Sequence, residues 1–394
     1  MLTLADALSL ALQHNPDIAA FSQELHAHEG AVLQAGVLPN PVLEVGGENL
    51  GNTRKAEEGD RSAIVQIGQL VELGGKRAAR VRLAEASRDL ASQDYEAKRI
   101  EILSQVAQRF IDVIASQQRE GLAGESVQLT LQVADVVGKR VQAGKASPVE
   151  DTKARLALAA SQVELEQARR ELVSARRTLG VLWGNPNPRF DRAIGDLEKL
   201  APLPDYERLA GRVRSNPELA RWSSETARRQ AAVDAEKAKT VPDITVTAAV
   251  SRFSQYYDNA YNLSISLPIP VFDRNDGGIL EASRRLDKAR DERRAAEGRM
   301  FTELARTYQR LAAIENEIEI LRATLLPGAQ SAFEAATRGY QLGKFGFLDV
   351  LDAQRTLFQA RSQHLRAMAD YQRGIAEIER LIGGPLDERP MNRP

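Results

Sequence analysis

Apolar and polar residues alternate along three short stretches of the chain. In residues 244–251, Ile244 and every second residue after it are apolar, with Thr, Ala and Ser between them. Residues 261–267 set Tyr, Leu, Ile and Leu against Asn, Ser and Ser, and residues 62–68 follow the same rule with Ala, Val and Ile. A period of two is typical of β-strands that have one apolar face. The pattern therefore predicts two β-hairpins with strands of roughly ten residues.

Long stretches after the hairpins predict helices of unusual length. Residues 76–143 contain no proline, and residues 279–342 contain only Pro327. At 1.5 Å per residue, each helix would be about 100 Å long. Each is expected to turn back at a short break that contains glycine and to continue as a second helix, at 149–182 or 347–382. Helices of this length predict a coiled coil or a helical tube.

The chain also repeats itself at an offset of about 200 residues. Asn15-Pro16 recurs as Asn216-Pro217, and each pair predicts a helix start with Asn as N-cap and Pro at the first helical position. Further matches join Leu38 to Leu43 with Thr240 to Ile244, Arg140 to Lys145 with Gly339 to Lys344, and Leu182-Trp183-Gly184 with Leu381-Ile382-Gly383.

We therefore predict two structural repeats and a short tail. The first repeat covers residues 1–190, with a helix, a β-hairpin at 42–72 and a long helix pair at 76–183. The second covers residues 204–385, with a helix, a β-hairpin at 243–272 and a long helix pair at 278–383. Residues 386–394 form a C-terminal tail.

Composition narrows the class of protein. The 394 residues carry 53 Lys and Arg against 54 Asp and Glu, so the net charge of -1 gives no reason to expect a nucleic-acid partner. The chain has no cysteine, which removes disulfides, thiolate metal sites and lipidation at an N-terminal cysteine. Its mean hydropathy of -0.35 and the lack of a long apolar run argue against a membrane-spanning helix. No signal peptide follows Met1, so an exported protein would be a mature or trimmed form.

The strands have the length that a tilted transmembrane β-strand needs. Strands in lipid must close into a barrel, and four cannot close alone, so lipid contact would demand two chains with eight strands or three with twelve. An alternative is two ordinary hairpins of a soluble domain. If the strands meet lipid, we predict two faces: Val65, Ile67, Val246, Ile265 and Leu267 towards lipid, and Gln66, Thr245, Ser264 and Ser266 towards the lumen. An arginine at Ile265 would then be costly if that residue lies near the bilayer midplane.

The order of short helix, hairpin and long helix pair, present twice, resembles the TolC family of outer-membrane efflux factors over nearly the whole chain. Residues 348–354, Leu-Asp-Val-Leu-Asp-Ala-Gln, and residues 144–150 carry the resemblance at the two turn-backs. Residues 72–77 and 267–275 are similar to the CzcC-like branch, which serves cobalt, zinc and cadmium efflux. The resemblance implies a mixed α+β membrane protein, a trimer with a 12-stranded transmembrane β-barrel, four strands per chain, continued by a 12-helix α-barrel tunnel.

The resemblance also implies the sites. Asp349 and Asp352 match an acidic constriction at the periplasmic end of the tunnel, and Glu150 matches the acidic residue of the other helix pair. Three-fold symmetry would turn the two aspartates into two acidic rings that favour cations. The alternative is that both acids only cap and solubilise a helix start. A basic residue in the family's latch is replaced here by Phe345. Gly144, Lys145, Gly343 and Lys344 would form the tips that meet a periplasmic adaptor protein, and Phe253, Tyr256, Tyr257 and Tyr261 would suit an aromatic girdle at the membrane interface.

No motif predicts an enzyme, a cofactor or a metal site. His26 and His28 are two residues apart and would point to different faces of a helix, and His14 and His364 are single. Residues 74–77, Gly-Gly-Lys-Arg, lack the phosphate-loop frame and better suit a bend between strand and helix. We therefore expect a passive outer-membrane conduit that extends into the periplasm and works with an adaptor and an inner-membrane RND pump. Its cargo would be divalent heavy-metal cations. The alternatives are a duct for organic compounds or drugs and, in another class, a soluble coiled-coil scaffold.

Overall fold

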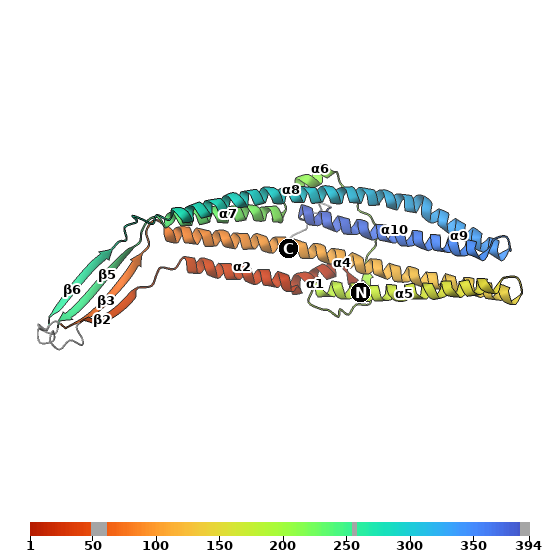
Figure 1. The fold of residues 1–394 in the computed structure, drawn as a ribbon, viewed down its shortest axis with the longest axis horizontal. Helices are drawn as coiled ribbons and strands as arrows, with labels where there is room; N and C mark the ends of the chain where they lie inside the picture. The colour runs from red at the N-terminus through yellow and green to blue at the C-terminus, as the bar shows by residue number, and fades with distance from the viewer. Residues whose placement is uncertain (49–60, 254–257, 387–394) are drawn as a thin grey trace. The chain divides into compact units, whose positions relative to one another are not determined.

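The computed structural model describes residues 1–48, 61–253 and 258–386 (Figure 1). The chain forms two compact units, each built from segments that are distant in sequence. The first unit holds residues 1–20, 96–217 and 297–394, and the second holds residues 21–95 and 218–296.

The second unit contains a four-stranded antiparallel sheet in the order β2-β3-β5-β6. Its strands are β2 (Val42–Glu48), β3 (Ser62–Val71), β5 (Ile244–Phe253) and β6 (Asn259–Ser266). The predicted alternation is confirmed by the register, in which Val65 pairs with Val250 and Val246 pairs with Ile265. Opposed residues share a face in an antiparallel sheet, so these four apolar side chains lie on one face.

The opposite face of the sheet is mostly polar. Thr245 pairs with Ser266 and Thr247 pairs with Ser264, while Gln66 donates a hydrogen bond to Glu44 on the neighbouring strand. The register therefore separates the predicted apolar and polar residues onto two faces, with one correction. Leu267 lies beyond the end of β6, because the chain leaves the ladder at Ser266 just before Pro268, which has no N–H to donate.

Helices make up the rest of both units. The N-terminal half has α1 (Leu4–His14), α2 (Pro16–Ala35), α4 (Lys76–Gln142) and α5 (Pro148–Val181). The C-terminal half has α6 (Tyr206–Val213), α7 (Pro217–Ala238), α8 (Asp276–Ile320), α9 (Leu326–Gln341) and α10 (Phe347–Ile382). Strands β1 (Leu2–Thr3) and β4 (Ala193–Ile194) form a parallel pair in the first unit. In the described ranges, none of the helices is both long and apolar enough to cross a membrane.

Both Asn-Pro pairs stand at helix starts as predicted, the capping hydrogen bond is observed for Asn15, and both asparagines also make a contact that the sequence did not reveal. Asn15 accepts a hydrogen bond from the backbone N–H of Ile18 at 3.0 Å, and its amide donates to the carbonyl of Leu182 at 2.7 Å. Asn216 likewise precedes α7, and its amide donates to the carbonyls of Arg380 and Leu381. Each buried asparagine therefore ties the start of one helix to the end of a long helix far away in sequence.

The long helix after the second hairpin is not a single α-helix. Residues Leu321–Leu325 form a π-helical turn (η1) between α8 and α9. Pro327 follows two residues after Leu325, in the first turn of α9. A proline within a helix lacks the N–H for the usual hydrogen bond and crowds the carbonyl of the preceding turn. A wider turn is one way in which a helix accommodates this defect, so the interruption precedes the proline.

The bend between β3 and α4 confirms the structural interpretation of Gly74-Gly75. Both glycines have positive φ, of 67° and 71°. A Cβ at Gly74 would lie 2.6 Å from the Cβ of Val241, whereas a Cβ at Gly75 would meet open space. Lys76 pairs with Asp243 at 2.8 Å across the same bend.

Alanine substitutions at these two glycines separate the cost of backbone strain from the cost of side-chain overlap, because only Gly74 lies against a neighbour. Gly75→Ala should destabilise the fold by about 1 kcal/mol, because only the left-handed backbone is strained. Gly74→Ala adds the overlap with Val241 and should cost roughly 2–4 kcal/mol. Thermal unfolding followed by circular dichroism would measure both, and an equal cost for the two substitutions would contradict this account of the bend.

Candidate functional site at the helix turn-backs

The two turn-backs of the first unit close with the same hydrogen-bonded motif. Gly144 and Gly343 have φ of 69° and 75°. The N–H of Lys145 donates to the carbonyl of Arg140 at 2.8 Å, and the N–H of Lys344 donates to the carbonyl of Gly339 at 2.8 Å. This Schellman closure needs a left-handed residue, which favours glycine. The predicted turn geometry is therefore confirmed at both positions.

The helices that leave the turn-backs are capped in different ways. Ser147 caps α5, accepting a hydrogen bond from the N–H of Val149, and Pro148 is the first helical residue. At α10, Asp349 accepts the N–H of Gly346 at 2.8 Å. An acid in the first turn also interacts favourably with the helix dipole. Asp349 thus has a structural role at the helix start.

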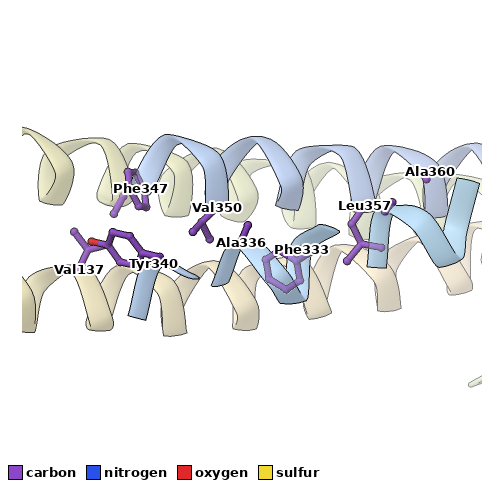
Figure 2. Close-up of a cluster of buried hydrophobic side chains, with 10 residues drawn as sticks. Val137, Phe333, Ala336, Tyr340, Phe347, Val350, Leu357 and Ala360 are labelled. Carbon is purple, nitrogen blue, oxygen red and sulfur yellow. The ribbon is translucent and has the colours of Figure 1, made fainter. Parts of the chain in front are cut away.

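Buried apolar side chains hold the helices together next to the turn-backs. Figure 2 shows Phe347 and Val350 of α10 with Tyr340 and Ala336 of α9 and Val137 of α4. The rings of Tyr340 and Phe347 meet edge to face with centroids 6.2 Å apart. This packing fixes where the two loops lie within the first unit.

Tyr340 joins both helix pairs through polar contacts. Its hydroxyl donates to Glu150 of α5 at 3.2 Å. The guanidinium of Arg140, from α4, lies 4.3 Å from the centre of the Tyr340 ring and also donates to the Tyr340 carbonyl. Burial raises the pKa of Tyr340, and the carboxylate of Glu150 raises it further. The hydroxyl therefore stays protonated and able to donate.

The comparisons with known proteins agree with this architecture. The family model described as "Outer membrane efflux protein" matches residues 7–185 and 213–384. The chain belongs to the outer membrane efflux protein family. The cobalt-zinc-cadmium resistance protein CzcC of Cupriavidus metallidurans is 40% identical over 382 residues, which are 97% of this chain and 90% of that protein. The nickel-cobalt-cadmium resistance protein NccC of Alcaligenes xylosoxydans xylosoxydans is 25% identical, over 76% of this chain and 70% of that protein.

A solved structure of CusC has the same fold. Its TM-score is 0.83 at 18% identity, and the match covers 97% of this chain and 92% of CusC. The family and the fold place the chain in the outer membrane, with an extension into the periplasm. Members of this family are efflux channels rather than enzymes.

The predicted acidic residues of this efflux protein lie in two settings. Asp349 and Asp352 are exposed on the first turns of α10. Glu150 is half-buried, and its carboxylate accepts a hydrogen bond from the hydroxyl of Tyr340 on α9. The sequence interpretation missed Tyr340 and Arg140, although both lie within the repeated segments that contain the two turn-back glycines.

The four predicted tip residues Gly144, Lys145, Gly343 and Lys344 are all exposed. Phe345, which the sequence analysis expects in place of a basic residue, is packed so closely beside Gly339 that a Cβ at Gly339 would overlap the Phe345 ring. The cation next to Tyr340 comes instead from Arg140. The basic residue beside the Tyr340 ring in this efflux protein is therefore supplied by α4.

The register of the sheet places two residues of the predicted aromatic girdle on opposite faces. Tyr261 pairs with Val250 on the apolar face and is 78% exposed. Phe253 pairs with Ser62 and so lies on the polar face. Tyr256 and Tyr257 lie outside the described residues.

Among the residues that are described, there is no group of three or more His, Asp or Glu side chains that could hold a metal ion.

Proposed function

We propose that three copies of this chain form a passive outer-membrane duct that exports divalent heavy-metal cations such as zinc, cobalt and cadmium. The proposal that the cargo is a metal ion rests on the 40% identity, over 97% of the chain, with a cobalt-zinc-cadmium resistance protein. The similarity to a nickel-cobalt-cadmium resistance protein points to the same class of ion.

The sheet supports a trimer. Strands β2 and β6 are the outer strands, and within the described residues neither has a partner on its outer side. Exposed edges in lipid would leave backbone groups unpaired, at a cost of several kcal/mol each. Antiparallel pairing of β6 with β2 of the next copy removes both edges, and three copies give the twelve strands of the proposed barrel. The apolar face, with Leu263 77% exposed and Val45 71% exposed, would then meet lipid.

The paired motifs support two structural repeats, 1–190 and 204–385; of the predicted tail at 386–394, residues 387–394 lie outside the described residues. Gly144 and Gly343 close the turn-backs alike, and Asn15 and Asn216 fasten two helix starts alike. Three such chains would contribute the long helices of a 12-helix tunnel across the periplasm.

The turn-backs would be the gate and the docking tips. Three copies of Asp349 and Asp352 would form acidic rings, which concentrate cations at a narrow opening. Glu150, Tyr340 and Arg140 would hold the two helix pairs of each copy together when the gate is closed. A periplasmic adaptor protein would contact the loops at Gly144, Lys145, Gly343 and Lys344, and an inner-membrane RND pump would supply the energy.

Loss of the chain tests this function directly. A strain without the gene should grow less well than its parent on zinc, cobalt or cadmium, and the intact gene should restore growth. Unchanged growth on all three ions, together with sensitivity to organic compounds, would instead establish a duct for organic cargo. Normal growth on metals and organic compounds alike would contradict a role in efflux.

Tyr340→Phe should loosen the closed tip. The substitution keeps the ring that packs on Phe347 and removes the hydroxyl that donates to Glu150, a bond to a charged group worth about 1.5–3 kcal/mol. We expect a higher conductance in planar bilayers than for the unaltered trimer. Tyr371→Phe is the control, since the Tyr371 hydroxyl donates to Ala201 away from the turn-backs. Equal conductance for both variants would contradict the role of Tyr340.

A further inference from the structure

The linker that follows β6 presents a fully exposed aromatic ring. Residues 267–272 read Leu-Pro-Ile-Pro-Val-Phe, and Phe272 is 100% exposed. Ile269 and Val271 are 78% and 59% exposed. Isolated exposed apolar residues are ordinary, but a continuous exposed apolar segment of this kind marks a contact surface.

The linker is held at both ends and stiffened between them. Pro268 and Pro270 restrict their own backbones, and the N–H of Val271 donates to the carbonyl of Ile269 at 2.9 Å. On the far side, the amide of Asn275 donates to the backbone carbonyl of Glu236 at 2.9 Å and to its carboxylate at 2.8 Å. The chain therefore presents Phe272 in a restrained position, which lowers the entropy lost when the ring binds.

The joint between α2 and β2 contains a hollow of about 600 Å³. Its walls include Ala31, Val37, Leu38, Pro39 and Arg80. Arg80 holds one wall of the hollow in place within a single copy, because its guanidinium donates to the carbonyls of Ala35 and Val37 and pairs with Glu72. The walls also include the amide side chains of Gln34 and Asn40. A hollow with mainly aliphatic walls and one guanidinium suits an aromatic ring, which can pack on the aliphatic groups and stack on the cation.

The order of the sheet determines which copy can fill the hollow. The hollow precedes β2 and the linker follows β6, and these are the two outer strands. The register Val42–Gly68, Gly68–Thr247 and Thr247–Ser264 places the start of β2 and the end of β6 at the same end of the sheet. When β6 of one copy pairs with β2 of the next, the linker of the first copy leaves the sheet beside the hollow of the second.

We infer that Phe272 of each copy inserts into the hollow around Leu38 and Arg80 of the next copy. This inference rests on the proposed trimer and identifies a contact that would close it just outside the sheet. The occupant is a second copy of this chain.

The absence of cysteine allows a clean crosslinking test. The double variant Phe272→Cys/Leu38→Cys, oxidised in the detergent-solubilised oligomer, should form a disulfide between copies and give a covalent trimer on non-reducing gels. The matched control is Phe272→Cys/Leu33→Cys, because Leu33 is 77% exposed on α2 but does not line the hollow. Phe272→Cys alone should give no crosslink.

A second variant measures the contribution of the ring itself. Phe272→Ala should leave the protomer folded, since the ring is fully exposed within it, and should speed subunit exchange by about tenfold or more per inserted ring. A trimer in which the control pair crosslinks as well as the test pair, or in which neither does, would overturn the insertion of Phe272 and leave the duct intact. So would a trimer crosslinked by Phe272→Cys alone. A protein that is monomeric in detergent would contradict the duct itself, and the inference with it.

Discussion

Replacing Leu263 by Arg is expected to destabilise the membrane-inserted trimer by roughly 2–4 kcal/mol for each copy, the cost of an arginine near the bilayer midplane on the lipid face of a barrel. Leu263 pairs with Ala248 near the middle of the sheet, on the apolar face, and is 77% exposed in the single chain. The loss should appear as a lower temperature at which the detergent-solubilised trimer dissociates, and as less protein in the outer membrane.

Two neighbouring substitutions serve as controls for depth and for face. Ile265 lies on the same face but next to the end of β6, so Ile265→Arg should cost only about 0–1 kcal/mol. The large cost considered for an arginine at Ile265 required a position near the midplane, and Leu263, at the middle of β6, meets that condition better. Asn262 pairs with Ala249 on the polar face, so Asn262→Arg should be tolerated. If Asn262→Arg proved costly and Leu263→Arg harmless, the assignment of lipid and lumen faces would be reversed.

Replacing Asp349 and Asp352 together by Asn should weaken cation selectivity and block by multivalent cations in single-channel recordings. The two acids would place six negative charges at the narrow end of a trimer, and the double variant removes all of them. Folding should change little, because an exposed acid near a helix start contributes about 0.3–1 kcal/mol. Asn at position 349 can still accept the N–H of Gly346 through its side-chain oxygen.

The control for charge alone is Asp287→Asn/Asp291→Asn, on α8. These acids are also exposed, at 52% and 68%, and their loss changes the net charge by the same amount. Recordings in which both double variants resemble the unaltered trimer would contradict the gate at Asp349 and Asp352. Glu150→Gln would then be the next substitution to record.

Local patterns in the sequence predicted much of the second unit and both turn-backs. The alternation in residues 244–251 was sufficient to place Val246 and Thr245 on opposite faces, because a strand has a fixed period of two. Glycine at the turn-backs and Asn-Pro at the helix starts are similarly local signals, since each satisfies backbone groups within a few residues. Near a strand end the signal fails, as at Leu267, because alternation does not show where pairing stops.

Contacts between distant segments could not be predicted in this way. Tyr340 and Glu150 are 190 residues apart, and nothing in their local sequence indicates that they meet. The hydrogen bonds from Asn15 and Asn216 to the ends of other helices are hidden for the same reason. The π-helical turn at Leu321–Leu325 was signalled only by Pro327, which marks a defect without specifying how the helix absorbs it.

Native mass spectrometry of the protein released from detergent would show directly whether this chain forms a trimeric membrane duct. We expect a single main species of three chains, about 130 kDa from 43.3 kDa each, that aggregates when detergent is removed. A 43.3 kDa monomer that stays in solution without detergent would contradict the duct and support a soluble coiled-coil scaffold.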